Sequence, residues 1–126
     1  GNPVAAAAGL KTMEVLRRPG QYDRLRALGQ EVMDMMATAL DDAGIAHRIC
    51  GDPTLYDIYF TDAEVVDYRS ARHRDPAMND TWNAALRDRG VFKAPGKLYP
   101  SLALTAEDME LTKQAIAHAT AALAQG

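Results

Sequence analysis

Lysine is the residue type in this sequence that could act as an amine nucleophile. The four lysines are Lys11, Lys93, Lys97 and Lys113. A lysine that forms a Schiff base has to be desolvated inside a cofactor pocket. Lys11 and Lys113 fall on the polar sides of expected helices, and Lys93 and Lys97 flank an exposed turn. We therefore expect all four lysines to be solvated.

The histidines, the cysteine and the serines form no catalytic or metal-binding pattern. His47, His73 and His118 have no second histidine, cysteine or carboxylate at a metal-ligand spacing. Cys50 has no neighbouring base and falls at the end of an expected strand, which is typical of a buried or half-buried structural thiol. Neither serine lies in a nucleophile elbow. The sequence predicts neither a metal site nor hydrolase chemistry.

A basic run occupies the polar segment between the central and the carboxy-terminal parts of the chain. It reads Arg69-Ser70-Ala71-Arg72-His73-Arg74. Such a run is able to touch a phosphate, but it lacks the interleaved aromatic residues of a nucleic-acid site. We expect residues 62–74 to form a solvated loop with at most a short helical turn.

Four segments carry the signals of helices, and these signals lie at their ends. Asn2-Pro3 and Asp75-Pro76 each combine a capping side chain with a proline at the first helical position. Thr105 is followed by an acidic first turn, as in a capping box. Pro19-Gly20, Gly44 and Gly90 read as helix stops. The expected helices span about 3–18, 22–43, 76–89 and 106–124.

The remaining segments favour short strands. Ile45–Cys50 and Leu55–Thr61 are rich in β-branched and aromatic residues and flank a turn. Val91–Lys93 and Leu98–Leu104 flank a second turn, with Pro100 limiting the latter strand. The order of elements predicts an α+β fold, with an antiparallel sheet of three to four strands packed against about four helices. We expect one domain over residues 1–126, helical over 1–44 and sheet-containing over 45–126.

Length, charge and cysteine content limit the partners and the cellular location that we expect for this chain. With 126 residues the chain can enclose one core, and a net charge of −3 without a basic face argues against nucleic acid and anionic membranes as partners. A single cysteine, no signal peptide and no bilayer-spanning apolar run indicate a reducing, cytoplasmic location. The chain begins at Gly1 rather than methionine, so we expect a piece of a larger protein.

An ordered series of short motifs extends along nearly the whole chain. It opens with Gly1-Asn2-Pro3-Val4, an alanine-rich stretch and Gly9-Leu10. The later motifs are Glu14-Val15-Leu16, Pro19-Gly20 with Tyr22, Phe60-Thr61-Asp62, Val66 with Tyr68, Asp88-Arg89-Gly90-Val91-Phe92, Ser101-Leu102-Ala103, and Thr105 with Glu107-Asp108. In this order they resemble class III aminotransferases, pyridoxal-phosphate (PLP) enzymes of fold type I. The most similar branch contains glutamate-1-semialdehyde 2,1-aminomutase and related aminotransferases.

The resemblance implies a carboxy-terminal small domain with the α+β layout described above. In the family the Schiff-base lysine, the aspartate that pairs with the pyridine nitrogen and most phosphate ligands precede the Gly-Asn-Pro helix, so the chain has no catalytic residue of its own. PLP is expected in the parent enzyme and not in this chain alone. The resemblance implies that the domain lines the substrate entrance and contributes to the homodimer interface. It also implies that Gly1 and Asn2 lie near the PLP phosphate of the neighbouring subunit.

Two departures and two alternatives accompany this interpretation. Leu104 stands where the family commonly has histidine, and the segment 94–101 is shorter than the corresponding segment of the aminomutase proper. We therefore expect the substrate of the parent enzyme to be an amino acid or an amine, without naming which one. One alternative is a free-standing, non-catalytic interaction or regulatory domain derived from the same family. The other is an unrelated small enzyme using His47 or His118, although no nucleophile is paired with either in the sequence.

Overall fold

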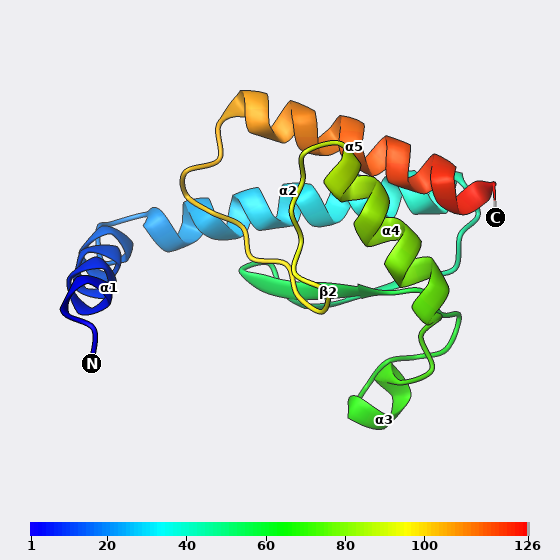
Figure 1. The fold of residues 1–126 in the computed structure, drawn as a ribbon, viewed down its shortest axis with the longest axis horizontal. Coiled ribbons are helices and arrows are strands. Elements are labelled where there is room, and N and C mark those ends of the chain that lie inside the picture. Colours follow the sequence, from blue (N-terminus) through cyan, green and yellow to red (C-terminus); the bar gives the residue numbers. More distant parts are fainter. Residues whose placement is uncertain (126) are drawn as a thin grey trace.

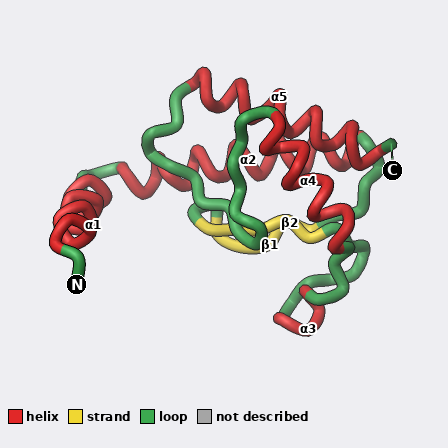
Figure 2. The backbone as a smooth tube through the Cα atoms, in the orientation of Figure 1, coloured by secondary structure: helices red, strands yellow, loops and turns green. Residues whose placement is uncertain are grey.

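Three helices cover one face of a small antiparallel sheet in the computed structural model, which describes residues 1–125 (Figure 1). The two strands lie together beneath these helices, and a further helix stands at the amino-terminal end (Figure 2). In chain order the elements are α1 (Pro3–Leu16), α2 (Gln21–Asp42), β1 (Arg48–Asp52), β2 (Leu55–Tyr59), α3 (Tyr68–Ala71), α4 (Pro76–Asp88) and α5 (Ala106–Ala124). The α+β class is confirmed.

The helices begin where the capping side chains predict. The Asn2 side chain accepts a hydrogen bond from the amide of Val4 at 3.0 Å, and Asp75 accepts from Met78 at 3.0 Å. Thr105 and Asp108 form the reciprocal pair of a capping box. The short α3 lies inside the segment expected to be a loop with at most a helical turn, because Asp67 and Ser70 cap one another there. These local contacts explain why α1, α4 and α5 were predictable to within about two residues; α2 has no side-chain cap and was predicted from its apolar periodicity and the glycine that follows it.

The sheet is smaller than predicted. Between residues 1 and 125 it contains β1 and β2 alone, paired antiparallel with Cys50 opposite Asp57. Leu98 joins β2 only through an isolated bridge, in which its amide donates to the Tyr56 carbonyl at 2.7 Å. Pro100 has no amide to continue the pairing, so the expected third strand stops after one bridge. The prediction of three to four strands is therefore not confirmed, and residues 91–93 form no strand.

The core lies between β2 and the three covering helices. Tyr56 and Ile58 project from β2 toward the helices, and Phe60 follows just after it. The rings of Phe60 and Trp82 meet edge to face, with centroids 5.7 Å apart. The helices contribute the other large buried side chains, among them Val32, Met36, Leu40, Leu86, Met109 and Ile116. This one cluster is the hydrophobic core of the chain.

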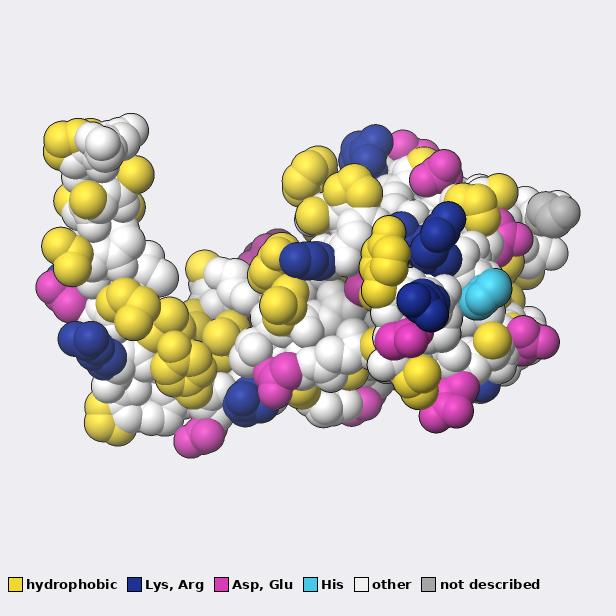
Figure 3. Space-filling model, turned by 90° about the horizontal axis from the view of Figure 1, so that it is seen from below, with side chains coloured by type: hydrophobic (Ala, Val, Ile, Leu, Met, Phe, Trp, Pro, Cys, Tyr) yellow, Lys and Arg dark blue, Asp and Glu magenta, His cyan; other side chains and the backbone are white. Residues whose placement is uncertain are grey.

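Helix α1 contributes nothing to that core. None of its side chains is buried, and the apolar Leu10 remains 70% exposed. In the space-filling view α1 stands off from the body of the molecule with hydrophobic side chains along it (Figure 3). An isolated helix of this length is marginal in water, since most helical stability in proteins comes from packing of an apolar face. No helix among residues 1–125 is long and apolar enough to cross a membrane.

Gly29 is the position at which α2 comes closest to the sheet connection. A Cβ atom built there would lie 1.8 Å from the carbonyl oxygen of Pro53 and 3.1 Å from Cγ of Pro100. Backbone cannot move away as a flexible side chain would. Glycine at this site therefore lets α2 pack directly on the β1–β2 turn.

Replacing Gly29 by alanine should lower the free energy of unfolding by about 2–3 kcal/mol, because the added methyl overlaps with backbone atoms. Urea unfolding followed by circular dichroism measures the loss. The matched control is Gly9→Ala on α1, where nothing lies within 4 Å and no loss is expected. A Gly29→Ala variant as stable as the native chain would contradict the close approach.

Candidate functional site

The most unusual chemical feature of the fold is a buried ion pair between a strand and a loop. Lys93 Nζ lies 2.9 Å from Asp57 Oδ1, and the two side chains are 0% and 5% exposed. The prediction that Lys93 is solvated is wrong. Asp57 alternates with Tyr56 and Ile58 along β2 and so lies on the opposite face of the strand. A buried carboxylate needs a counter-ion, which brings the lysine inward.

A second cation completes this cluster. Nη1 of Arg74 lies 3.5 Å from Asp57 Oδ2, and its guanidinium stands 5.8 Å from the ring centroid of Tyr59. Lys93 also donates to the carbonyl of Ala94 at 3.1 Å. One buried carboxylate thus joins β2 to the segment before α4 and to the loop after it. We call Asp57, Arg74 and Lys93 the Asp57 cluster.

Cys50 is the cross-strand neighbour of Asp57, and its thiol is half-buried, as predicted. Burial raises the pKa of the Cys50 thiol above its ordinary value, Arg48 lowers it by less, and the charge of Asp57 adds a smaller increase. A thiol with a raised pKa is mostly protonated at neutral pH and is a poor nucleophile. The thiol beside the Asp57 cluster is therefore not an activated nucleophile.

The histidines do not come together. His47 Nδ1 lies 2.9 Å from the carbonyl oxygen of Ile45, His118 Nδ1 lies 3.3 Å from Arg89, and His73 is exposed near α3. Across residues 1–125 no group of three or more histidine, cysteine or carboxylate side chains has a geometry that could hold a metal ion. The described part of the chain thus offers neither a metal centre nor a histidine paired with a nucleophile.

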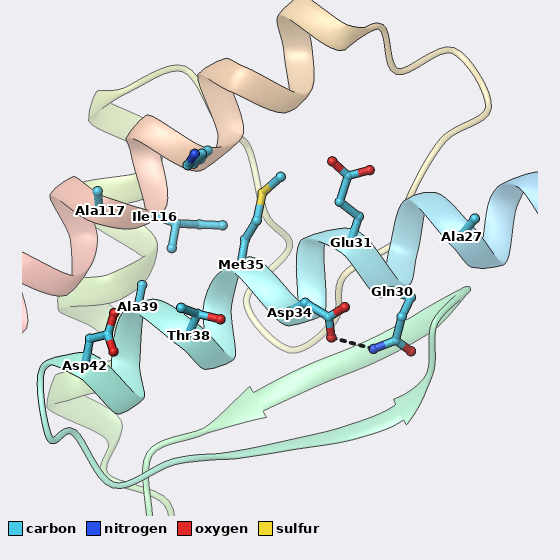
Figure 4. A pocket seen from close by; sticks show the side chains of 11 residues that line it. Ala27, Gln30, Glu31, Asp34, Met35, Thr38, Ala39, Asp42, Ile116 and Ala117 are labelled. Carbon is cyan, nitrogen blue, oxygen red and sulfur yellow. Dashed lines mark hydrogen bonds between the residues drawn. The ribbon is translucent and has the colours of Figure 1, made fainter.

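A groove with an apolar floor lies between α2 and α5 (Figure 4). It has a volume of about 750 Å³. Its floor is apolar, and Gln30 donates to Asp34 at 2.8 Å on its rim. The lining residues are Ala27, Gln30, Glu31, Asp34, Met35, Thr38, Ala39, Asp42, Lys113, Ile116 and Ala117. We call this hollow the α2/α5 groove; an apolar floor with a charged rim suits binding rather than catalysis.

Gly1 and Asn2, the residues expected near a neighbouring phosphate, lie at the free end of α1. The amino terminus is at the far side of the molecule from α3, α4 and α5 (Figure 1). The Asn2 oxygen is occupied by the amide of Val4. The structure therefore keeps these two residues apart from the Asp57 cluster, and their predicted proximity to a phosphate remains a prediction.

Sequence reasoning missed the Asp57 cluster because its members are far apart along the chain. One signal was available: Asp57 interrupts an otherwise apolar and aromatic strand, Leu55-Tyr56-Asp57-Ile58-Tyr59-Phe60. An acidic residue in a strand of this kind requires a cation nearby. The sequence alone does not say which of the cations supplies it.

Removing Asp57 should destabilise the chain by about 3–5 kcal/mol, because the buried Lys93 is left without a counter-ion, whereas removing Lys93 should cost less, because Asp57 keeps Arg74. Asp57→Asn and Lys93→Met are the single variants, and urea unfolding is the measurement. The double variant should lose less than the sum of the two, since it leaves no buried unpaired ammonium group. Lys97→Met, at an exposed lysine, is the control and should leave stability unchanged. Additive effects of the two single changes would argue against the pair.

No protein-family model matches the chain. Known proteins nevertheless resemble it along almost its whole length. It is 37% identical over 115 residues to glutamate-1-semialdehyde 2,1-aminomutase of Heliobacterium modesticaldum, covering 89% of this chain and 26% of the relative. It is 38% identical over 130 residues to the enzyme of the same name from Propionibacterium freudenreichii, covering 100% of this chain and 29% of the relative.

Solved structures give the same result. An omega-transaminase from Sphaerobacter thermophilus superimposes with a TM-score of 0.79 at 27% identity, over 100% of this chain and 29% of that one. A transaminase with PLP bound matches with a TM-score of 0.78 at 24% identity, which supports the fold alone. The chain spans between a quarter and a third of the length of the relatives it matches. Since this similarity extends over nearly all of its residues, the chain belongs to the family of the glutamate-1-semialdehyde 2,1-aminomutases and related transaminases.

Proposed function

We propose that the chain is the carboxy-terminal domain, residues 1–126, of a longer PLP-dependent aminotransferase or aminomutase that acts on an amino acid or amine. The observation that carries this proposal is the 38% identity to an aminomutase over the full length of the chain. A cytoplasmic location belongs to the same proposal. Its substrate stays at the level of a class because Leu104 departs from the family pattern.

The lysines argue that the chain is catalytically incomplete by itself. Lys93 is buried, but its amine is engaged by Asp57 at 2.9 Å and by the Ala94 carbonyl at 3.1 Å. Lys11, Lys97 and Lys113 are exposed. The described residues therefore do not fit a PLP site, since no lysine is both desolvated and free. The Schiff-base lysine would be supplied by a part of the enzyme outside these residues.

Helix α1 supports a role in contacts with the rest of the enzyme. None of its side chains is fully buried within residues 1–125, where only Val15 and Leu16 at its end are half-buried, and a helix with this composition is stable when a second surface covers it. The remainder of the aminotransferase chain and the homodimer partner are the surfaces we propose. Gly1 and Asn2, at its first turn, would then come near the phosphate of the neighbouring subunit.

The loop after α4 supports a role at the substrate entrance. Phe92 is 80% exposed although its neighbour Lys93 is fully buried. Tyr99, further along the loop, is also exposed. The Asp57 cluster holds the loop in place, so that both aromatic rings are presented outward. A free-standing regulatory domain, the second candidate, would be expected to carry a polar surface, and the exposed apolar side of α1 does not favour it.

Incubation with PLP followed by borohydride reduction tests the first part of this proposal. Mass spectrometry of the chain should find no stoichiometric adduct at a single lysine, because no described lysine is both buried and unpaired. The product of the longer gene is the positive control and should carry one adduct at a lysine outside Lys11, Lys93, Lys97 and Lys113. A specific adduct at one of these four would show that the chain holds the cofactor lysine after all.

Substitution on α1 tests the second part. In the longer enzyme Leu10→Glu should lower the share of PLP-loaded dimer by about tenfold, because a charge is placed in a contact that must be dry. Analytical ultracentrifugation and the absorbance of bound PLP report dimer and cofactor separately. Lys11→Glu, one residue along on the polar side of the same helix, is the control and should have little effect. An unchanged Leu10→Glu dimer would exclude α1 from the interface.

A further inference from the structure

The connection from α4 to α5, residues 89–105, borders a small pocket of about 230 Å³. This connection descends from the end of α4 to β2 and then returns to the start of α5 (Figure 1). The pocket lies between the connection, α2, β2 and the first turns of α5, and we call it the α4–α5 loop pocket. Its apolar lining includes Tyr56, Val91, Leu98, Leu104 and Leu111.

Two anchors fix the connection to consecutive residues of β2. Leu98 and Tyr56 exchange both backbone hydrogen bonds, at 2.7 and 3.3 Å. Lys93 Nζ lies 2.9 Å from Asp57, the next residue of the strand. The stretch between Lys93 and Leu98 is therefore held at both of its ends, once by backbone and once by a buried ion pair.

Two aromatic residues, Phe92 and Tyr99, stand at the ends of this anchored stretch, each one residue beyond an anchor. Both line the pocket, and both remain exposed. An aromatic side chain offers a large apolar contact area at a low cost in conformational entropy. The pocket thus has a preformed aromatic rim over an apolar interior.

The charges around the pocket disfavour an anionic ligand. Among residues 1–125, Asp108 is the one charged side chain in the lining, and Thr105 donates to it from its amide and its hydroxyl. These hydrogen bonds hold the pKa of Asp108 below its ordinary value, so the carboxylate is negative at neutral pH. Three cations belong to the connection, but Lys93 is buried against Asp57, the Arg89 guanidinium lies 3.3 Å from a histidine ring nitrogen on α5, and Lys97 is outside the lining. A carboxylate in the pocket would meet like charge and no counter-ion.

We propose that the α4–α5 loop pocket binds the uncharged, apolar side chain of the substrate of the parent enzyme. This inference rests on the proposed function, in which the connection lies at the substrate entrance. It narrows the substrate to an apolar amine or amino acid and excludes one whose side chain carries a carboxylate. The volume suits a subsite for one group, because complete small-molecule sites occupy about 300–1,000 Å³. The reacting amine would then lie outside the pocket.

Substrate preference in the longer enzyme tests this inference. The second-order rate constant for amino transfer to bound PLP is measured with two matched pairs, 2-phenylethylamine against 4-aminobutyrate and phenylalanine against glutamate. The apolar member of each pair should react at least about tenfold faster. Leu111→Arg should lower that preference about tenfold, because the guanidinium fills the pocket and supplies a counter-ion for a carboxylate.

Matched variants separate the pocket from general effects of substitution. Leu111 is 44% exposed, so the longer side chain has room, and Leu55 is 43% exposed but lies outside the lining. Leu55→Arg should therefore leave the preference unchanged. Tyr99→Ala, on the exposed rim, should slow the apolar member of each pair alone. In the 126-residue chain, 2-phenylethylamine should shift the amide resonances of the pocket residues in NMR spectra, and 4-aminobutyrate should not.

The outcomes distinguish this inference from the proposed function. An enzyme that reacts with no amine would overturn the proposed function, and the assignment of the pocket to a substrate with it. An active enzyme that prefers the acidic member of both pairs, or equal effects of Leu111→Arg and Leu55→Arg, would overturn this inference and leave the proposed function standing. So would a Leu111→Arg enzyme with unchanged preference that no longer forms dimers in sedimentation velocity, since the pocket would then belong to the partner subunit.

Discussion

The packing of β2 against three helices is the interaction on which the rest of the structure depends. A two-stranded sheet is not stable by itself in water, so its apolar face must be covered. On that face Tyr56 and Ile58 belong to one buried cluster with side chains from α2, α4 and α5. Just after the strand the ring of Phe60 packs edge to face against Trp82. The α4–α5 contact is extensive, and α2 and α5 run side by side across the top (Figure 1). Every other element is attached to this unit.

The opposite face of β2 is organised by charge. Asp57 forms ion pairs with Lys93 and with Arg74. These pairs connect two loops that are distant in sequence to the same strand. A buried pair of this kind adds little net stability compared with apolar side chains, but breaking it is costly. Its effect is to specify the path of the loop that carries Phe92. We infer that this constraint, rather than further strand pairing, determines the shape of the molecule after α4.

The length of the relatives and the exposure of α1 are consistent with one another. The relatives are three to four times longer than the residues they share with this chain, and α1 is a long helix with no fully buried side chain among residues 1–125. A piece of a longer chain is expected to expose apolar surface of this kind. Among residues 1–125 the buried lysine, Lys93, is paired with Asp57, and the other three lysines are exposed.

The sequence by itself determined the four long helices and the family. Caps such as Asn2, Asp75 and Thr105 act on amides two or three residues away, so their effect is readable along the chain. Only the tertiary structure decided the size of the sheet, the burial of Lys93 and the α2/α5 groove. Strand pairing after Leu98 depends on what lies beside β2, and the lysine's environment depends on a carboxylate from another element. Sequence patterns report local hydrogen bonds well and long-range charge pairing poorly, because the partner of a buried charge is chosen by the fold.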